Sequence, residues 1–317
     1  LCSACQYAWH LFGDEFDWFM MNPREAWAGA GYTRVHDFIE GTGHNPSFPN
    51  FAYYNAPMKD GKEHAEYMGM VWMGWPTGFG IVHEFGHGLL GINTVNFPGE
   101  GLRQWNAEDG AHIDSNSTTR GGLQGPVWDP DRGWPYALKL NDGSANEWEF
   151  PEVYIALDDQ GQLYLRPADD DRYVWSDIFL YMMGLIDAAD SEETYYKLVN
   201  PIYGDCETRE YSYVCNDDSV SAEELVEYSI ADMVERYGPW VSNSPGFDPT
   251  SLQVGILNVS DRQHTEAEIV LLSRQIRRYT EKDVVKVEGS GEYTWWWSTR
   301  GLSELVIDFT DRLLPGE

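Results

Sequence analysis

The pentapeptide His83-Glu84-Phe85-Gly86-His87 constrains the fold of this chain more than any other segment. Its histidines stand four residues apart, and this spacing brings both imidazoles to one side of the backbone when the segment is a helix. Two imidazoles so placed can hold one zinc ion, and the glutamate between them then stands beside the metal as a general base. Because Pro76-Thr77-Gly78 precedes the motif and Gly91 follows it, we predict a helix over residues 80–91. The alternative is a polar helix whose two histidines are held by ordinary hydrogen bonds.

A catalytic zinc site usually has three protein ligands and leaves a fourth position for water. The third ligand does not follow the metzincin spacing H-E-x-x-H-x-x-G-x-x-H, because Leu90 and Asn93 occupy the places of its glycine and last histidine. We favour His112, since imidazole is the better zinc donor and flanking aspartates could hold its other ring nitrogen. Glu108 is the alternative, at the separation that a thermolysin-like site uses. The candidates considered are Glu100, Glu108, Asp109, His112 and Asp114.

Composition narrows the set of partners. The chain has 317 residues and is 42% hydrophobic, so it can bury a sizeable core, and it has no apolar run long enough for a membrane span. Its 52 acidic and 21 basic residues give a net charge of −31, which repels phosphate backbones, so we expect no nucleic-acid partner. The acidic residues are typical of a solvated surface, of salty or extracellular surroundings, or of Ca²⁺ binding. Asp129–Gly133 and Asp169–Asp171 are the calcium candidates, with solvated turns as the alternative.

The four cysteines indicate an oxidising compartment. An even count in a non-cytosolic chain is typical of disulfides, and Cys2, Cys5, Cys206 and Cys215 allow three pairings. Cys206 and Cys215 flank a short polar segment and could close a loop. The chain begins at Leu1 with no basic region followed by an apolar one, so we expect a processed product whose export signal has been removed. We therefore expect a secreted, extracellular or periplasmic protein.

The pattern of apolar residues and turn signals predicts an α+β fold. The expected elements are a mixed sheet, an active-site helix, long loops over residues 92–150 and a helical C-terminal part. Strands are predicted over residues 16–21, 32–35, 68–75 and 252–259, with a hairpin formed by residues 153–157 and 162–165. Helices are predicted over residues 176–187, 191–199, 221–237 and 265–281. We expect a catalytic domain over residues 1–200 with a C-terminal α/β subdomain over residues 201–317 packed on it, and a single domain is the alternative.

Beyond the motif, the chain resembles a family of secreted bacterial zinc metallopeptidases. Asp14–Trp18 is similar to its D-x-F-D strand, and Val35–Gly43 is similar to a segment before its active helix. Asp109–His112 resembles its G-x-H-W, with Ile113 in place of the tryptophan. Trp175–Leu185 resembles its Y-S-x-L-D-x-Y-L-M-G-L, with Phe179 in place of the acid, and residues 231–281 resemble its tail. The resemblance implies a zincin-like fold, with His83, His87 and His112 as ligands and Glu84 as base.

These observations predict a zinc-dependent endopeptidase that cleaves extracellular proteins or glycoproteins. The alternative is a non-catalytic module that binds carbohydrate or protein and carries a structural metal. The chain has 14 tryptophans, and indole rings can form a platform on which sugars stack. The candidates for such a platform are Trp72, Trp75, Trp128, Trp134 and Trp295–Trp297.

Overall fold

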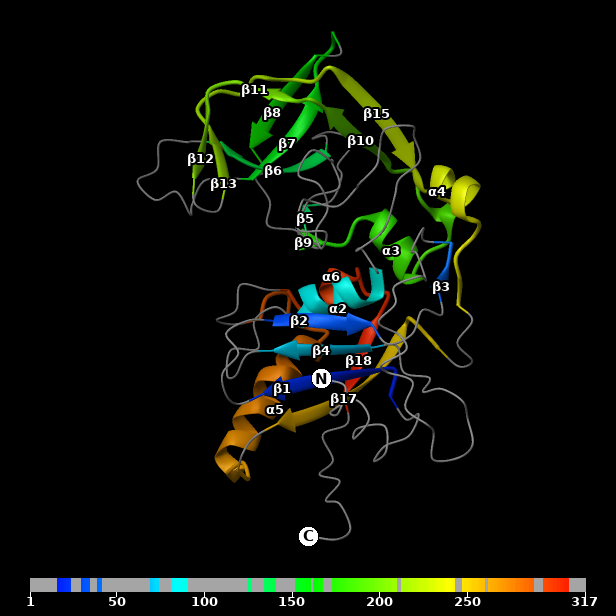
Figure 1. The fold of residues 1–317 in the computed structure, drawn as a ribbon, viewed down its shortest axis with the longest axis vertical. Coiled ribbons are helices and arrows are strands. Elements are labelled where there is room, and N and C mark those ends of the chain that lie inside the picture. Colours follow the sequence, from blue (N-terminus) through cyan, green and yellow to red (C-terminus); the bar gives the residue numbers. More distant parts are fainter. Residues whose placement is uncertain are drawn as a thin grey trace. The chain divides into compact units, whose positions relative to one another are not determined.

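The structure is a computed structural model of the whole chain. The residues that it describes are 16–23, 30–34, 39–41, 69–73, 81–90, 125–126, 134–140, 152–160, 162–167, 173–209, 212–242, 247–259, 262–287 and 293–307. The chain forms a mixed α+β structure with few helices among these residues (Figure 1).

The chain divides into two compact units, and the first of them is discontinuous in sequence. Unit 1 combines Leu1–Phe38, Pro46–Leu89 and Ser242–Glu317, whereas unit 2 combines Ile39–Asn45 and Leu90–Val241. This division differs from the expected boundary between residues 200 and 201. The reason is that the chain returns to its first sheet after residue 242, where a late strand pairs with the first strand.

Unit 1 is built on a five-stranded mixed sheet. The strand order is β18-β17-β1-β4-β2, and Figure 1 shows β2, β4, β1 and β17 stacked in that order. Strands β18, β17, β1 and β4 run parallel to one another. The edge strand β2 is antiparallel to β4. The strands are β1 Trp18–Pro23, β2 Ala30–Arg34, β4 Gly69–Met73, β17 Ser251–Val259 and β18 Glu304–Ile307. The sequence predicted β1, β2, β4 and β17 to within a few residues.

Strand β1 lies in the middle of the sheet, and its side chains are buried on both faces. Trp18, Phe19 and Met20 are all buried, which is typical of a parallel strand covered on both sides. Gly255 lies opposite Phe19, and a Cβ there would come within 2.7 Å of the Phe19 ring, so only glycine allows this approach. Asp17 fixes the start of the pairing, since the backbone N–H of Gln253 donates to its carboxylate at 2.7 Å.

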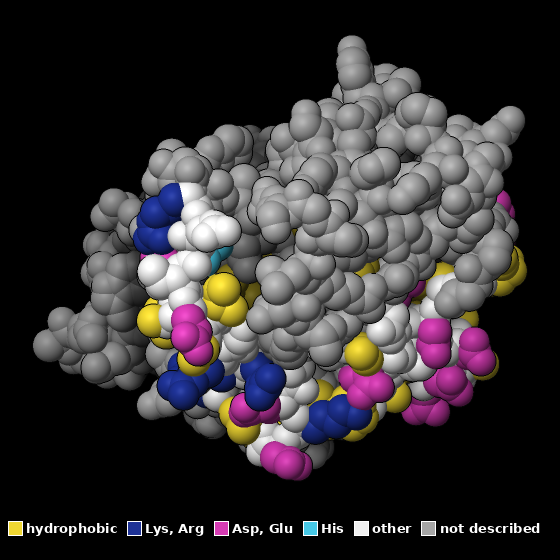
Figure 2. Space-filling model, turned by 90° about the horizontal axis from the view of Figure 1, so that it is seen from below, with side chains coloured by type: hydrophobic (Ala, Val, Ile, Leu, Met, Phe, Trp, Pro, Cys, Tyr) yellow, Lys and Arg dark blue, Asp and Glu magenta, His cyan; other side chains and the backbone are white. Residues whose placement is uncertain are grey.

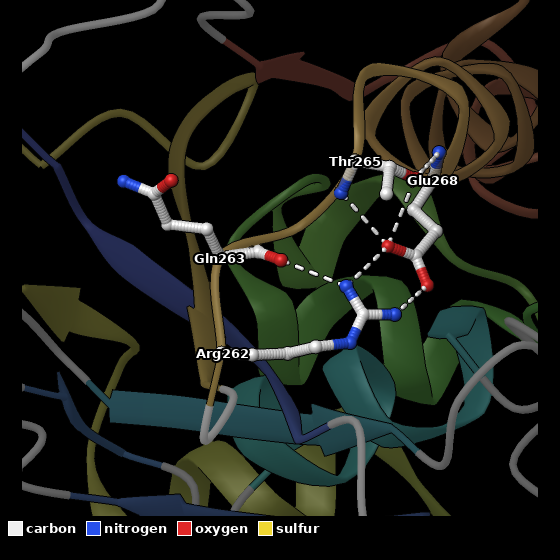
Figure 3. Close-up of polar contacts among 4 residues, drawn as sticks. All are labelled: Arg262, Gln263, Thr265 and Glu268. Carbon is white, nitrogen blue, oxygen red and sulfur yellow. Dashed lines mark hydrogen bonds and ion pairs between the residues drawn. The ribbon is translucent and has the colours of Figure 1, made fainter.

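Helix α5, Glu266–Thr280, matches the predicted helix over residues 265–281 and begins at a capping box formed by Thr265 and Glu268. The hydroxyl of Thr265 accepts from the backbone N–H of Glu268 at 3.3 Å, and the Glu268 carboxylate accepts from the backbone N–H of Thr265 at 2.8 Å (Figure 3). Arg262 adds two hydrogen bonds to the same carboxylate, at 2.7 and 3.0 Å. Leu272, Ile276 and Tyr279 of α5 are buried, whereas Ile269 is exposed.

Unit 2 contains a second five-stranded sheet, in the order β12-β13-β6-β7-β8. The predicted hairpin is confirmed as β7 and β8, which pair antiparallel. Cys206 and Cys215 lie directly opposite each other on β12 and β13 and form a disulfide. Cys215 belongs to a core with Ile155, Leu165, Leu198 and Val220. The strands are β6 Trp134–Leu140, β7 Glu152–Leu157, β8 Leu163–Pro167, β12 Cys206–Arg209 and β13 Ser212–Cys215.

Short two-stranded pairs complete the described strands. Strand β10 pairs with β15, β11 with β14, β5 with β9, and β3 with β16. Their bounds are β3 Ile39–Glu40, β5 Gly125–Pro126, β9 Tyr173–Val174, β10 Thr194–Val199, β11 Ile202–Tyr203, β14 Val220–Ser221, β15 Glu224–Ser229 and β16 Val241–Ser242.

Two predicted helices in unit 2 are wrong. The predicted helix over residues 191–199 is strand β10, and the first half of the predicted helix over residues 221–237 is strand β15. These two strands pair with each other, and the rings of Tyr195 and Tyr228 stack with centroids 5.5 Å apart. Helix α4, Ile230–Tyr237, therefore starts later, at a capping box made by Ser229 and Asp232.

Helix α3, Asp177–Met183, is shorter than predicted because Gly184 ends it. Gly184 adopts φ 79°, in the left-handed region, and its backbone N–H bonds back to the helix. Every side chain from Ile178 to Met183 is buried, so α3 is a core helix of unit 2. The short helix η4, Ala188–Asp190, follows it.

Candidate metal centre

The motif forms a helix, as its spacing predicts. Helix α2 spans Ile81–Leu90, one residue shorter at each end than expected. Its described buried residues are Val82, Phe85, Gly86 and Leu89, which recur at the three- and four-residue intervals of one helix face. His83 lies outside this stripe and is half-buried. The first motif histidine is therefore placed between core and surface, where a side chain can reach both.

Phe85, in the middle of the motif, anchors α2 in the core of unit 1. Its ring meets the ring of Trp18 edge-on, with centroids 5.9 Å apart and planes at 67°. It meets the ring of Trp295 in the same way, at 6.2 Å and 64°. Trp18 comes from β1 and Trp295 from helix α6, Trp295–Ser298. Helix α2 thus lies against the sheet face that carries Trp18.

The predicted site residues differ in how far the structure describes them. His83 is described with its side chain, and Glu84 and His87 are placed on α2 by their backbone. The side chains of Glu84 and His87 lie outside the described residues, as do His112 and its alternative Glu108. Among the described side chains, no three His, Cys, Asp or Glu residues are grouped so as to hold a metal ion. The ligand set therefore stays a prediction, supported by the helical spacing of its first two members.

The phenols of Tyr181 and Tyr173 are candidate donors to a developing oxyanion. Tyr181 also takes part in the fold. Its hydroxyl accepts a hydrogen bond from the backbone N–H of Trp240 at 3.0 Å. Burial raises the pKa of this hydroxyl above its usual 10. Tyr173, the other candidate, lies on β9 with its side chain outside the described residues.

A buried carboxylate lies at the start of α3 and was not predicted from the sequence. Glu193 accepts hydrogen bonds from the backbone N–H of Asp177, at 3.0 Å, and from the hydroxyl of Tyr195. The Tyr195 hydroxyl in turn accepts from the backbone N–H of Ile178 at 3.0 Å. Burial, with the neighbouring Glu193 carboxylate, raises the pKa of Tyr195 well above its usual 10. No local pattern signals this cap, because Glu193 lies sixteen residues from Asp177, just before a strand that the sequence did not predict.

Of the tryptophan triplet, Trp295 belongs to the core, whereas Trp296 and Trp297 are half-buried. Trp295 is fully buried. The Nζ atom of Lys282 lies 4.5 Å from the centroid of the Trp296 ring, and the same ammonium group pairs with Glu304. Of the other candidate platform residues, Trp72 and Trp134 lie on β4 and β6 with side chains outside the described residues, and Trp75 and Trp128 lie outside them altogether.

The described surface of the chain mixes charges of both signs. On the face shown in Figure 2, Lys and Arg side chains lie among Asp, Glu and hydrophobic side chains, while toward the right of the view the charged side chains are acidic and lie beside hydrophobic ones. The calcium candidates Asp129–Gly133 and Asp169–Asp171, and the cysteines Cys2 and Cys5, lie outside the described residues.

Within the part of the chain that is described, no helix is long and apolar enough to span a bilayer.

Comparison with known proteins adds no relative to this picture. No protein-family model, curated protein or solved structure matches the chain. The candidate centre is thus defined by its own residues: a motif helix held on the sheet by Phe85, with His83 beside the buried stripe.

Proposed function

We propose that this protein is a zinc-dependent endopeptidase with a zincin-like fold. The observation that carries the proposal is that His83-Glu84-Phe85-Gly86-His87 lies on one helix, and that His83 is not among the described buried residues of that helix. Residues four apart on a helix share a side, so the two histidines have the spacing that zinc requires. A histidine with only a hydrogen-bonding role needs neither the second histidine at this interval nor the glutamate between them.

The donor chemistry of these residues fits zinc. His83 and His87 would supply two imidazole nitrogens, and His112, or alternatively Glu108, would supply the third ligand. Bound there, zinc would supply Lewis acidity toward the substrate carbonyl and lower the pKa of a water molecule toward about 7. His83 is half-buried, which suits a zinc ligand, because one side of its imidazole can contact the core while the other side faces a substrate.

Glu84 performs the proton transfers in this mechanism. Its carboxylate accepts a proton from the water molecule whose oxygen adds to the peptide carbonyl carbon. It then delivers that proton to the amide nitrogen as the C–N bond breaks, which yields one carboxylate and one amine. A carboxylate beside two imidazoles on one helix is suited to both transfers because it does not have to move between them.

The proposed substrates are extracellular proteins or glycoproteins. The disulfide between Cys206 and Cys215 supports an oxidising compartment, and therefore a secreted or periplasmic location. The burial of Trp295 excludes this residue from a sugar-binding platform built on the triplet.

Metal content and proteolysis, measured on the same purified protein, test the proposal. We expect about one zinc ion per chain and cleavage of an unfolded test protein. Chelation should abolish cleavage and added zinc should restore it, while added Ca²⁺ alone should not. Binding of glycans or proteins with no cleavage in the presence of any metal would support the non-catalytic alternative.

A further inference from the structure

We infer that the C-terminal segment over residues 293–307 positions the motif helix, with Trp295 as its contact residue. The inference rests on the proposed function, because it assigns Trp295 a role toward the zinc ligands of α2. It extends that function to a segment far from the motif in sequence, for which no residue pattern signals a role.

The contact begins at Phe85, which lies two residues from each motif histidine. Its ring is fully buried and lies edge-on to both Trp18 and Trp295, which are themselves fully buried. Edge-to-face contacts of this kind hold a ring by direction as well as by packing. A shift of α2 along or around its axis would carry Phe85 away from these rings, and the two histidines would move with it.

Trp295 is itself fixed by a chain of buried hydrogen bonds. Its indole N–H donates to the hydroxyl of Ser303 at 3.0 Å, and that hydroxyl donates to the carbonyl of Pro249 at 2.6 Å. The hydroxyl of Thr299 accepts from the backbone N–H of Ser303 at 3.2 Å and lies 2.9 Å from the carbonyl of Trp295.

A second anchor lies at the start of α6. The hydroxyl of Thr294 donates to the carbonyl of Val284 at 2.8 Å, and its backbone N–H donates to the carbonyl of Val285 at 3.0 Å. Thr294, Thr299 and Ser303 are all fully buried. Buried polar groups with satisfied hydrogen bonds favour a single arrangement, since any other leaves a group unpaired. The segment can therefore hold the Trp295 ring at a fixed position for Phe85.

Two variants test this role, and a third serves as a matched control. Ser303→Ala removes the acceptor of the Trp295 indole, and Trp295→Phe removes the indole N–H while keeping an aromatic ring. Trp296→Phe makes the same exchange at the next residue, whose ring contacts Lys282. All three variants should lose some thermal stability, so stability alone does not separate a positioning role from a structural one.

The first readout is hydrogen exchange of the α2 amides in the metal-free full-length protein. We expect exchange about tenfold faster in Ser303→Ala and Trp295→Phe than in the wild type, and unchanged exchange in Trp296→Phe.

The second readout is the dissociation constant of zinc, measured by competition with a chromogenic chelator well below the unfolding temperature. We expect affinity about tenfold weaker in the first two variants and within about twofold of wild type in the control.

Each result bears on a different claim. If the wild type binds zinc but Ser303→Ala and Trp295→Phe leave both readouts at wild-type values, the positioning role is wrong and the proposed function stands. Equal effects in all three variants reduce the segment to general stability and also overturn the inference. A wild type that binds no zinc overturns the proposed function together with any role toward a metal, while the exchange of α2 still reports whether Trp295 braces the helix.

Discussion

Glu84 is the residue on which the proposed chemistry depends most directly. Replacing it with glutamine keeps the size of the side chain but removes the proton acceptor, so we expect turnover to fall by about 10² to 10⁴-fold. Zinc content should stay at the wild-type level because the imidazoles are unchanged. Steady-state cleavage of a fluorogenic peptide and metal analysis of the same sample measure both quantities. Wild-type turnover in Glu84→Gln would exclude this residue as the base.

His83 gives the complementary result at the same site. His83→Ala removes a proposed ligand from a half-buried position, so zinc should be lost together with activity. Circular dichroism should still show a folded protein, since the buried stripe of α2 does not include this residue. Retention of a full equivalent of zinc in His83→Ala would remove His83 from the ligand set.

Residue-level prediction from sequence works where a site lies within one element. His83, Glu84 and His87 are readable because helical spacing alone relates them. The contact of Phe85 with Trp295 could not be predicted, because the two residues are more than two hundred positions apart in the sequence. The third ligand has the same difficulty, since nothing local relates His112 or Glu108 to α2.

The end of helix α3 offers a test of how one element is terminated. A Cβ on Gly184 would overlap the ring of Trp240, whose indole N–H donates to the carbonyl of Met182 at 3.1 Å. Gly184→Ala combines this overlap with a left-handed backbone, so we expect a loss of about 2–4 kcal/mol in the free energy of unfolding. In a Trp240→Ala background the same change should cost only about 1–2 kcal/mol. Equal costs in the two backgrounds, measured by urea unfolding, would show that the ring does not matter.

The start of α3 predicts a dependence of stability on alkaline pH. The pKa of Tyr195 is raised in the folded state, chiefly by burial, so the folded protein holds this proton more tightly than the unfolded chain. Its contribution is fully present below about pH 10 and is lost as the pH rises above that value. Tyr195→Phe should cost about 1–3 kcal/mol at pH 7, since Glu193 loses a donor. The variant should also lose stability less steeply above pH 10, and a parallel decline in both proteins would contradict this assignment.

Elements were predictable where local signals and tertiary pairing agree. Strand β17 and helix α5 were found because a continuous apolar run and a capping box have no competing arrangement. Strand β15 was assigned to a helix because Ser221–Glu224 matches a capping box in sequence. The cross-strand pairing of β10 with β15 overrides that signal, and the real cap is eight residues later, at Ser229.

For the molecule as a whole, the discontinuity of unit 1 has a direct consequence. A chain shortened to end at residue 241 lacks β17 and β18, so β1 loses its partner on one side and α2 loses Trp295. We expect the β1 and α2 amides to lose protection from hydrogen exchange, while the disulfide-linked sheet of unit 2 keeps its protection. Full protection of β1 in the shortened chain would contradict this division. Sequence alone did not reveal the division, because no clear linker marks where the chain passes between the two units.

The most direct test of the zinc site is an anomalous difference map, collected at the zinc edge from crystals grown with zinc. We expect one strong peak at about 2.0–2.1 Å from an imidazole nitrogen of His83 and of His87, with a third protein ligand bound to the same ion. The same map would identify that ligand as His112, Glu108 or another residue. Two motif imidazoles pointing apart, with no anomalous peak between them, would contradict the central claim.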